Sequence, residues 1–199
     1  MKKEEFADRL SCACASVISA EQELTEIDSH FGDADHGLTM KKIAGAIDSA
    51  VKGSDGGIKE MLDDAAMAVM VLNGGSAVPL WNAWLDGMQE DAPEGDEIDV
   101  SGIKAVFKRA FEELDSVSGA KVGDKTMMDA LIPASEAIAS YKGSDENELF
   151  AIAARAAAEA SRQFVSKFGR AKSYGTQTIG TPDAGAVSMA YFFRGLARA

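Results

Sequence analysis

Apolar residues recur at helical spacing through most of the chain. The clearest case is the segment 103–114, where positions i, i+4, i+7, i+8 and i+11 hold Ile103, Phe107, Ala110, Phe111 and Leu114. Asp99 or Ser101 is suited to cap this helix. We find no convincing alternation of apolar and polar residues of the kind that marks a strand. The pattern predicts an all-α fold with about eight helices.

The same spacing predicts the remaining helices. They cover residues 4–20, 38–51, 58–72, 79–88, 125–141, 150–164 and 183–197. The acidic segment 86–99 is interpreted as a solvated connection. The polar segment 169–185 is long for a loop in a compact helical protein, which favours a functional role.

Length and charge narrow the function classes. The 199 residues predict a single domain spanning 1–199. The 20 basic and 32 acidic residues give a formal net charge of −12, which argues against binding to nucleic acid or to an anionic membrane. Cys12 and Cys14, with no metal-ligand cluster around them, are expected to be buried or idle thiols. With no signal sequence and no long apolar run, we expect a cytoplasmic protein.

Three aspartates lie close together at residues 28, 33 and 35. A loop opened by Gly32 allows Asp28, Asp33 and Asp35 to converge, and converging carboxylates repel one another unless a hard cation such as Mg²⁺ lies between them. An EF-hand is excluded, because neither its glycine nor its final acid is in place. The alternative is that Asp33 and Asp35 form a turn and a helix cap beside an unrelated Asp28.

Two glycine-containing segments bear on nucleotide binding. The run Gly74-Gly75-Ser76-Ala77 precedes a predicted helix, and a helix N-terminus with a hydroxyl beside it suits a phosphate, although a plain turn also explains it. The segment 123–126 ends like a Walker A motif, but Asp124 replaces its glycine and no strand precedes it. A P-loop is therefore excluded.

Taken together, four segments resemble the nucleotide-binding L subunit of the dihydroxyacetone kinase family. They are residues 30–40 (HFGDADHGLTM), 74–80 (GGSAVPL), 123–129 (GDKTMMD) and 169–186, and their order and spacing agree over essentially the whole chain. The resemblance implies an antiparallel eight-helix barrel whose loops at one end hold ADP or ATP through two Mg²⁺ ions.

The resemblance also implies roles for individual residues. Asp28, Asp33 and Asp35 would be the metal ligands. The implied nucleotide contacts are His36, Gly37, Leu38 and Thr39 along the nucleotide, Ser76 and Ala77 at the phosphates, Gly119, Thr126 and Met127 at the adenine, Arg170 at the phosphates, and Asp183, Ala184 and Gly185 closing over the nucleotide. Positioning does most of the work in phosphoryl transfer, so no catalytic base is assigned to this chain.

Family partners follow from the same resemblance. The sugar-like substrate would be held by a separate K-type subunit, which makes this chain half of an enzyme. The leading hypothesis is a phosphoenolpyruvate-dependent system in which a phosphotransferase M-type subunit recharges bound ADP. The alternatives are the L domain of an ATP-dependent ketose kinase, a non-catalytic nucleotide-binding module that regulates a partner such as a transcription regulator, and a plain all-α scaffold.

The sequence departs from the family pattern in three of its loops. Ala and Ser are exchanged and Val78 replaces a glycine within 74–80, Thr39 stands where asparagine is common, and Ala184 replaces a proline. A Glu-Arg-Ser run becomes residues 176–178 (TQT), which removes a positive charge near the expected subunit interface. These changes leave the aspartates in place and make a different small ketose or polyol an alternative acceptor.

Overall fold

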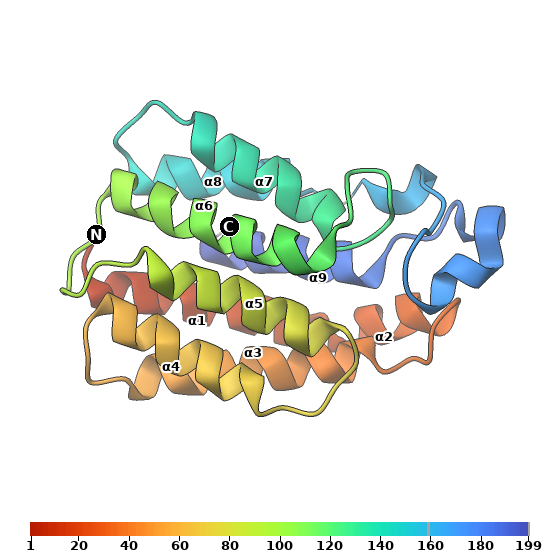
Figure 1. The fold of residues 1–199 in the computed structure, drawn as a ribbon, viewed down its shortest axis with the longest axis horizontal. Coiled ribbons are helices and arrows are strands. Elements are labelled where there is room, and N and C mark those ends of the chain that lie inside the picture. Colours follow the sequence, from red (N-terminus) through yellow and green to blue (C-terminus); the bar gives the residue numbers. More distant parts are fainter. Residues whose placement is uncertain (159, 199) are drawn as a thin grey trace.

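The computed structural model describes residues 1–158 and 160–198, and its regular structure there is helical apart from an isolated bridge between Lys2 and Glu97. This confirms the predicted all-α class. The α-helices are α1 (Lys3–Ser19), α2 (Glu21–Ser29), α3 (His36–Gly53), α4 (Ile58–Met70), α5 (Ala77–Glu90), α6 (Val100–Ser118), α7 (Met128–Ser140), α8 (Glu146–Ala156) and α9 (Ala184–Leu196). Two 3₁₀ segments, η1 (Ser161–Gln163) and η2 (Arg170–Thr178), lie between α8 and α9 (Figure 1). None of the helices described combines the length and the apolar character needed to cross a membrane.

Helix contacts close into a ring. In the order α1, α3, α4, α5, α6, α7, α8 and α9, each helix packs against the next, and α9 packs back against α1. The short helix α2 lies outside this order, against α3 and α9. Neighbouring helices run in opposite directions, so the connections 30–35, 71–76 and 119–127 and the described part of 157–183 all lie at one end of the molecule (Figure 1).

Aromatic side chains fill the interior of the ring. Trp84 is fully buried and meets Trp81 edge-to-face at a centroid distance of 5.5 Å, and Phe192 at 5.2 Å. Phe107 and Phe193 extend the cluster across α6 and α9. Each such aromatic pair contributes about 0.5–1.5 kcal/mol beyond simple burial. The middle of the ring is therefore closely packed, and space for a ligand has to be found at its ends.

A buried arginine joins three helices at the other end of the ring. Arg9 of α1 is 1% exposed and donates to the Leu196 carbonyl at 3.1 Å and to the Asn147 side chain. Its guanidinium lies over the Phe150 ring, 5.0 Å from the centroid. Hydrogen bonds and ring contact together offset the cost of burying this charge.

Several predicted helix boundaries are corrected by tertiary hydrogen bonds. The predicted helix 150–164 begins earlier, after the Asp145 cap, and ends at Ala156, because backbone groups of 161–164 bond to another loop. The predicted helix 125–141 begins only at Met128, since Lys125 has a left-handed φ of 61° that no α-helix accepts. Residue 159, inside the first of these predictions, lies outside the described residues.

Other differences concern polar segments. Helix α2 was not predicted, because Leu24 is its sole buried residue and gives no periodic apolar face. The predicted loop 86–99 is helical as far as Glu90, and the predicted loop 169–185 contains η2.

The predicted cap of the helix that contains residues 103–114, and the two cysteines, agree with their predictions more closely than the helix boundaries do. Asp99 is the cap of α6 and accepts from the Gly102 N–H at 2.8 Å. Cys14 is buried, which raises the pKa of its thiol to about 12, while Cys12 is exposed.

Candidate functional site

The four loops at one end of the ring enclose a cavity of about 610 Å³. Its lining comes from α2 and the loop after it, from the start of α5, from residues 117–127 and from the connection between α8 and α9. Trp81 lies on its inner wall, where the aromatic interior begins. The predicted site residues that line it are Asp28, Asp33, Asp35, His36, Thr39, Ser76, Ala77, Thr126, Met127, Arg170, Asp183, Ala184 and Gly185.

Three predicted site residues do not line the cavity. Gly37 is buried where α3 meets α2, and a Cβ there would lie 2.1 Å from the Glu21 carbonyl oxygen. Leu38 is exposed on the outside of α3. Gly119 ends α6 with a left-handed φ of 63°, between the lining residues Ser118 and Ala120. Gly37 and Gly119 are thus next to lining residues in the chain, whereas Leu38 contributes nothing to the cavity.

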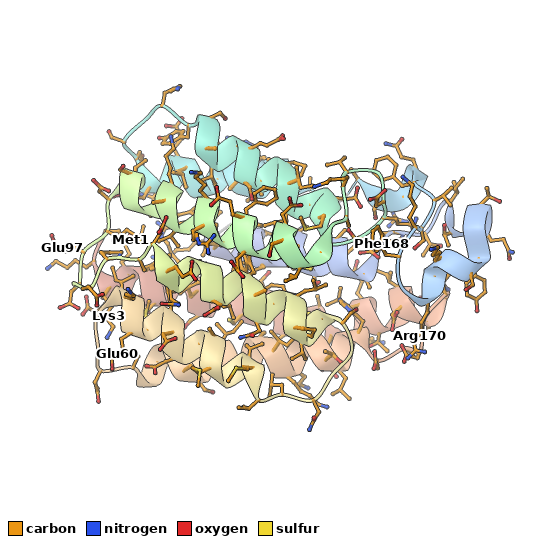
Figure 2. The ribbon with its side chains drawn as sticks, viewed as in Figure 1. Met1, Lys3, Glu60, Glu97, Phe168 and Arg170 are labelled. Carbon is orange, nitrogen blue, oxygen red and sulfur yellow. The ribbon has the colours of Figure 1, made fainter. Side chains whose placement is uncertain are left out.

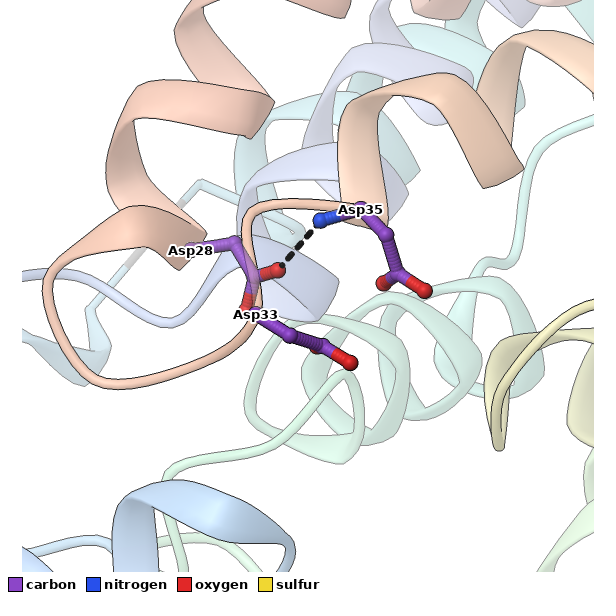
Figure 3. Close-up of side chains that lie close together, drawn as sticks. All are labelled: Asp28, Asp33 and Asp35. Atoms are coloured by element: carbon purple, nitrogen blue, oxygen red, sulfur yellow. Dashed lines mark hydrogen bonds between the residues drawn. The ribbon is translucent and has the colours of Figure 1, made fainter.

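The three aspartates converge. Asp28, Asp33 and Asp35 each present a carboxylate oxygen, and the three oxygens lie within 4.8 Å of one another (Figure 3). Asp28 is half-buried and the other two are exposed. Three hard oxygen donors at this separation form a set that fits Mg²⁺, and without a cation their charges repel.

Local backbone geometry brings the carboxylates together. Asp28 Oδ2 accepts from the Asp35 N–H at 3.1 Å (Figure 3). It also accepts from the His36 N–H at 3.3 Å, so it caps α3 from the preceding helix. Gly32 allows this approach, because a Cβ there would lie 2.0 Å from Asp28 Oδ1. Ala34, between the other two ligand candidates, has a left-handed φ of 60°. The cap on α3 is therefore Asp28, and Asp35 makes no side-chain cap bond.

Arg170 lies beside the aspartate cluster. Its Nη2 is 2.6 Å from Asp33 Oδ2. The ring of Tyr174, from the same 3₁₀ segment, lies 5.1 Å from that of Phe31 in the aspartate loop. The connection between α8 and α9 thus contacts the aspartate loop through an ion pair to Asp33 and a ring contact to Phe31. Figure 2 shows Arg170 and Phe168 at this end of the molecule.

The N-terminus of α5 is open toward the cavity. The helices α3, α7 and α9 also begin at this end, and each has a side-chain oxygen bound to its first N–H groups. No such acceptor binds Ser76 or Ala77 at the start of α5 within the described residues. Both residues line the cavity. Free N–H groups and the helix dipole together make this a position for an anion.

Two departures from the family pattern meet at one glycine. A Cβ on Gly74 would lie 2.6 Å from Val78 Cγ2 and 3.0 Å from Thr39 Cγ2. Val78 and Thr39 therefore occupy the space beside this glycine, and they fix the loop that leads into α5.

The segment 123–129 is organised by a buried carboxylate. Asp129 is 2% exposed and accepts from the Gly123 N–H at 2.6 Å and from the Thr126 N–H at 2.7 Å. Lys125 is also buried, and the prediction from sequence gave it no role. A lysine within a polar, glycine-containing motif is a signal for a functional residue. The sequence alone, however, does not show that the loop directs the Lys125 side chain inward.

Two titratable groups at the cavity have shifted pKa values. Burial raises the pKa of Asp183 to about 7, against the opposing effect of the hydrogen bond from the Ala186 N–H. Burial also lowers the pKa of His36, although Asp28 and Asp35 act in the other direction. His36 Nε2 lies 3.3 Å from Ser188 Oγ.

Comparison with known proteins places these observations in a family. A model of the family described as DAK2 domain matches residues 30–198. The chain is 35% identical over 190 residues to a D-erythrulose kinase of Mycolicibacterium smegmatis and 33% identical over 199 residues to an L-erythrulose kinase of Pectobacterium atrosepticum. Each match covers 92% of this chain but only about a third of the relative.

A smaller relative matches along nearly its whole length. The ADP-binding subunit DhaL of the PEP-dependent dihydroxyacetone kinase of Escherichia coli is 27% identical over 195 residues, which cover 94% of this chain and 92% of that subunit. The fold is also that of part of a solved structure, the dihydroxyacetone kinase from C. freundii in complex with AMP-PNP and Mg²⁺. The two align with a TM-score of 0.72 at 22% identity, covering 96% of this chain and 33% of the kinase.

Proposed function

The chain belongs to the DAK2 domain family, and from this premise we propose that it is the nucleotide-binding subunit of a kinase for a small ketose. The observation that carries the proposal is that three converging carboxylates and the open N-terminus of α5 face the same cavity. One group of residues suits cations and the other suits phosphate oxygens, which together match a metal-bound nucleotide.

Each part of the cavity has a role in this proposal. Asp28, Asp33 and Asp35 would hold two Mg²⁺ ions, which when bound offset the negative charge of the phosphate chain during phosphoryl transfer. The backbone N–H groups of Ser76 and Ala77 would bind phosphate oxygens at the start of α5. Arg170, now beside Asp33, would reach the same oxygens.

The remaining lining residues would hold the rest of the nucleotide. Thr126 and Met127, with Gly119 behind them, would border the adenine, and His36 and Thr39 would lie along the nucleotide. Asp183, Ala184 and Gly185 would close the site from the start of α9. The acceptor would be held by a separate K-type subunit, and an M-type phosphotransferase subunit would recharge bound ADP.

Two acceptors are consistent with the relatives. The E. coli subunit belongs by its name to a dihydroxyacetone kinase, whereas the relatives with 33–35% identity are erythrulose kinases. Val78 and Thr39 change the loop before α5 relative to the usual family pattern. We therefore propose dihydroxyacetone or a four-carbon ketose such as erythrulose as the acceptor, and the K-type subunit that holds it would make the choice between them.

Heating the purified chain and identifying any released nucleotide tests the donor. Tightly held ADP in stoichiometric amount supports the phosphoenolpyruvate-dependent system. An empty site that exchanges ATP freely supports the ATP-dependent alternative.

Reconstitution tests the activity. The chain is mixed with a K-type subunit, a phosphoryl donor and either dihydroxyacetone or erythrulose, and phosphorylated ketose is measured. Failure to form product with any small ketose, despite bound nucleotide, would overturn the kinase and leave the nucleotide-binding regulatory module.

A further inference from the structure

The connection between α8 and α9 has few apolar groups to hold it in place. In the part of residues 160–183 that the structure describes, the buried residues are Ser161, Ser166, Thr178 and Pro182. Three of these four are polar, so hydrophobic burial contributes little to the order of this segment. We call residues 160–183 the strap. Polar contacts must account for its shape.

One buried ammonium group gathers four carbonyls of the strap. Lys125 Nζ lies within hydrogen-bonding distance of four carbonyl oxygens, those of Ser161 and Phe164 at 3.1 Å each, Thr178 at 2.8 Å and Thr181 at 2.5 Å, and these share its three N–H groups. These acceptors come from both ends of the strap, and the side chain that joins them is 4% exposed. Hydrogen bonds from a charged donor are about twice as strong as neutral ones, and losing this donor would leave buried carbonyls unpaired.

The loop that carries Lys125 is built to aim it inward. The residue has a left-handed φ of 61°, an unfavourable conformation for a residue with a Cβ. Asp129 holds the backbone on either side by accepting from Gly123 and Thr126. The surrounding hydrogen bonds therefore maintain a costly backbone conformation that places the ammonium group under the strap.

The strap carries residues of the candidate site. Arg170 follows Gly169 at the start of η2 and contacts Asp33. Asp183 lies at the end of the strap, and its N–H donates to Ser161 Oγ at 2.7 Å. Since Ser161 is also bound by Lys125, the lysine and Asp183 belong to one hydrogen-bonded unit. Arg170 lies in the segment between Phe164 and Thr178, whose carbonyls the lysine binds.

We propose that Lys125 is a positioning residue that anchors the strap, so that Arg170 and Asp183 are held at the nucleotide. This inference rests on the proposed nucleotide site, but the anchoring itself is measurable without any nucleotide. Other contacts keep the strap attached when the anchor is removed, including the Lys167 N–H bond to the Asp124 carbonyl at 3.1 Å. Removing the ammonium group should therefore loosen the strap rather than unfold the ring.

The experiment compares Lys125→Met with the wild type and with Lys121→Met. Lys121 lies in the same loop but is exposed and pairs with Asp115, so it serves as the matched control. Hydrogen exchange of strap amides is measured without ligand, together with the affinities for Mn²⁺ alone and for Mg·ADP. If Lys125→Met does not fold, Lys125→Gln keeps two donors and takes its place.

The expected pattern is selective. Strap amides exchange roughly 10–100-fold faster in Lys125→Met and Mg·ADP affinity falls by a similar factor, the range typical of residues that orient the groups contacting a ligand. Mn²⁺ affinity stays within a few-fold of the wild type, because Asp28, Asp33 and Asp35 lie outside the strap. A protein that was merely unfolded would lose Mn²⁺ binding as well.

Other outcomes overturn the inference. Unchanged strap exchange would show that Lys125 is not the anchor, and a loosened strap with unchanged Mg·ADP affinity would show that it does not position the site. Wild-type protein that binds no adenine nucleotide would refute the proposed function instead, while the strap exchange still decides whether Lys125 is the anchor.

Discussion

The guanidinium of Arg170 lies 2.6 Å from the carboxylate of Asp33, one of the three aspartates that face the cavity. This ion pair places one positive charge beside three negative ones and so offsets part of their repulsion. Its side chains are 71% and 43% exposed, and ion pairs at such positions contribute only about 0–1 kcal/mol. A divalent cation can therefore displace the arginine from Asp33 at little cost.

Replacing Arg170 should separate cation binding from nucleotide binding. In Arg170→Ala, Asp33 loses its competing partner, so Mn²⁺ affinity without nucleotide should rise by up to about fivefold, as a loss of 0–1 kcal/mol implies. Mg·ADP affinity should fall, because a donor to the phosphates is lost. Titration of both ligands checks this, with Lys172→Ala on the same 3₁₀ segment as the control. A parallel fall in both affinities would contradict a role at the phosphates.

Replacing a candidate metal ligand should have a larger effect. In Asp33→Asn, Mg²⁺-dependent ADP binding should weaken by about 100-fold or more, beyond the 10–100-fold typical of residues that only support a ligand. Helicity should change little, since the exposed loop contributes no core contact. Calorimetry of Mg·ADP binding and far-ultraviolet circular dichroism measure the two effects. Asp63→Asn on the exposed face of α4 is the control, and equal affinity in both variants would remove the metal site from the proposal.

The raised pKa of Asp183 predicts a pH dependence of stability. The folded chain releases this proton near pH 7 and the unfolded chain near the ordinary value of 3.8, so the folded state binds more protons between these values. The contribution of Asp183 to stability is therefore lost as pH rises from about 4 to 7, by at most about 1.4 kcal/mol per pH unit.

Asp183→Asn tests this dependence. Asparagine can keep the cap on the Ala186 N–H but has no proton to lose, so the variant should gain stability relative to wild type between pH 5 and pH 8. Urea unfolding at the two pH values measures the gain. Asp99→Asn at the cap of α6 is the control, because it measures how an asparagine changes the unfolding stability at a helix cap away from the cavity. A difference between Asp183→Asn and wild type that does not change with pH would contradict the raised pKa.

Two helical glycines should respond in opposite ways to alanine. A Cβ on Gly195 would lie 2.4 Å from the Cys12 carbonyl oxygen and 2.5 Å from Ala13 Cα, where α9 closes against α1. Gly195→Ala should therefore destabilise the protein by about 1–3 kcal/mol. Gly45 in α3 has no such neighbour within 4 Å, so Gly45→Ala should stabilise by about 0.5–1 kcal/mol through helix propensity. Thermal unfolding of both variants measures these effects. Opposite shifts in Tm would show that the close contact dominates at Gly195 and that helix propensity dominates at Gly45.

The apolar pattern was sufficient for the fold class and for most helices, because core positions such as Ile103 and Phe107 repeat with the helical period. It failed where tertiary hydrogen bonds override propensity. The alanines after Ala156 favour a helix, yet the carbonyls of Ser161 and Phe164 bind Lys125 instead. Helix α2 is not predicted from the sequence, because its one buried leucine gives no periodic apolar face.

For the site, spacing alone indicated that Asp28, Asp33 and Asp35 could converge, and the structure brings them together. The pairing of Arg170 with Asp33 was not predictable, because they lie 137 positions apart in the chain and no local rule links the two loops. The role of Lys125 was hidden for the same reason. The carbonyls that it binds leave no signature in the sequence.

The contact between α1 and α9 also sets the order of events during synthesis. While the ribosome is still adding α9, α1 lacks its neighbour, and the interior lacks Phe192 and Phe193. Contacts between such distant segments form slowly, and intermediates that lack them expose apolar surface. The mouth of the cavity is incomplete as well, since Ala184 and Gly185 arrive with the same helix. A nascent chain therefore has no finished cavity until α9 has emerged.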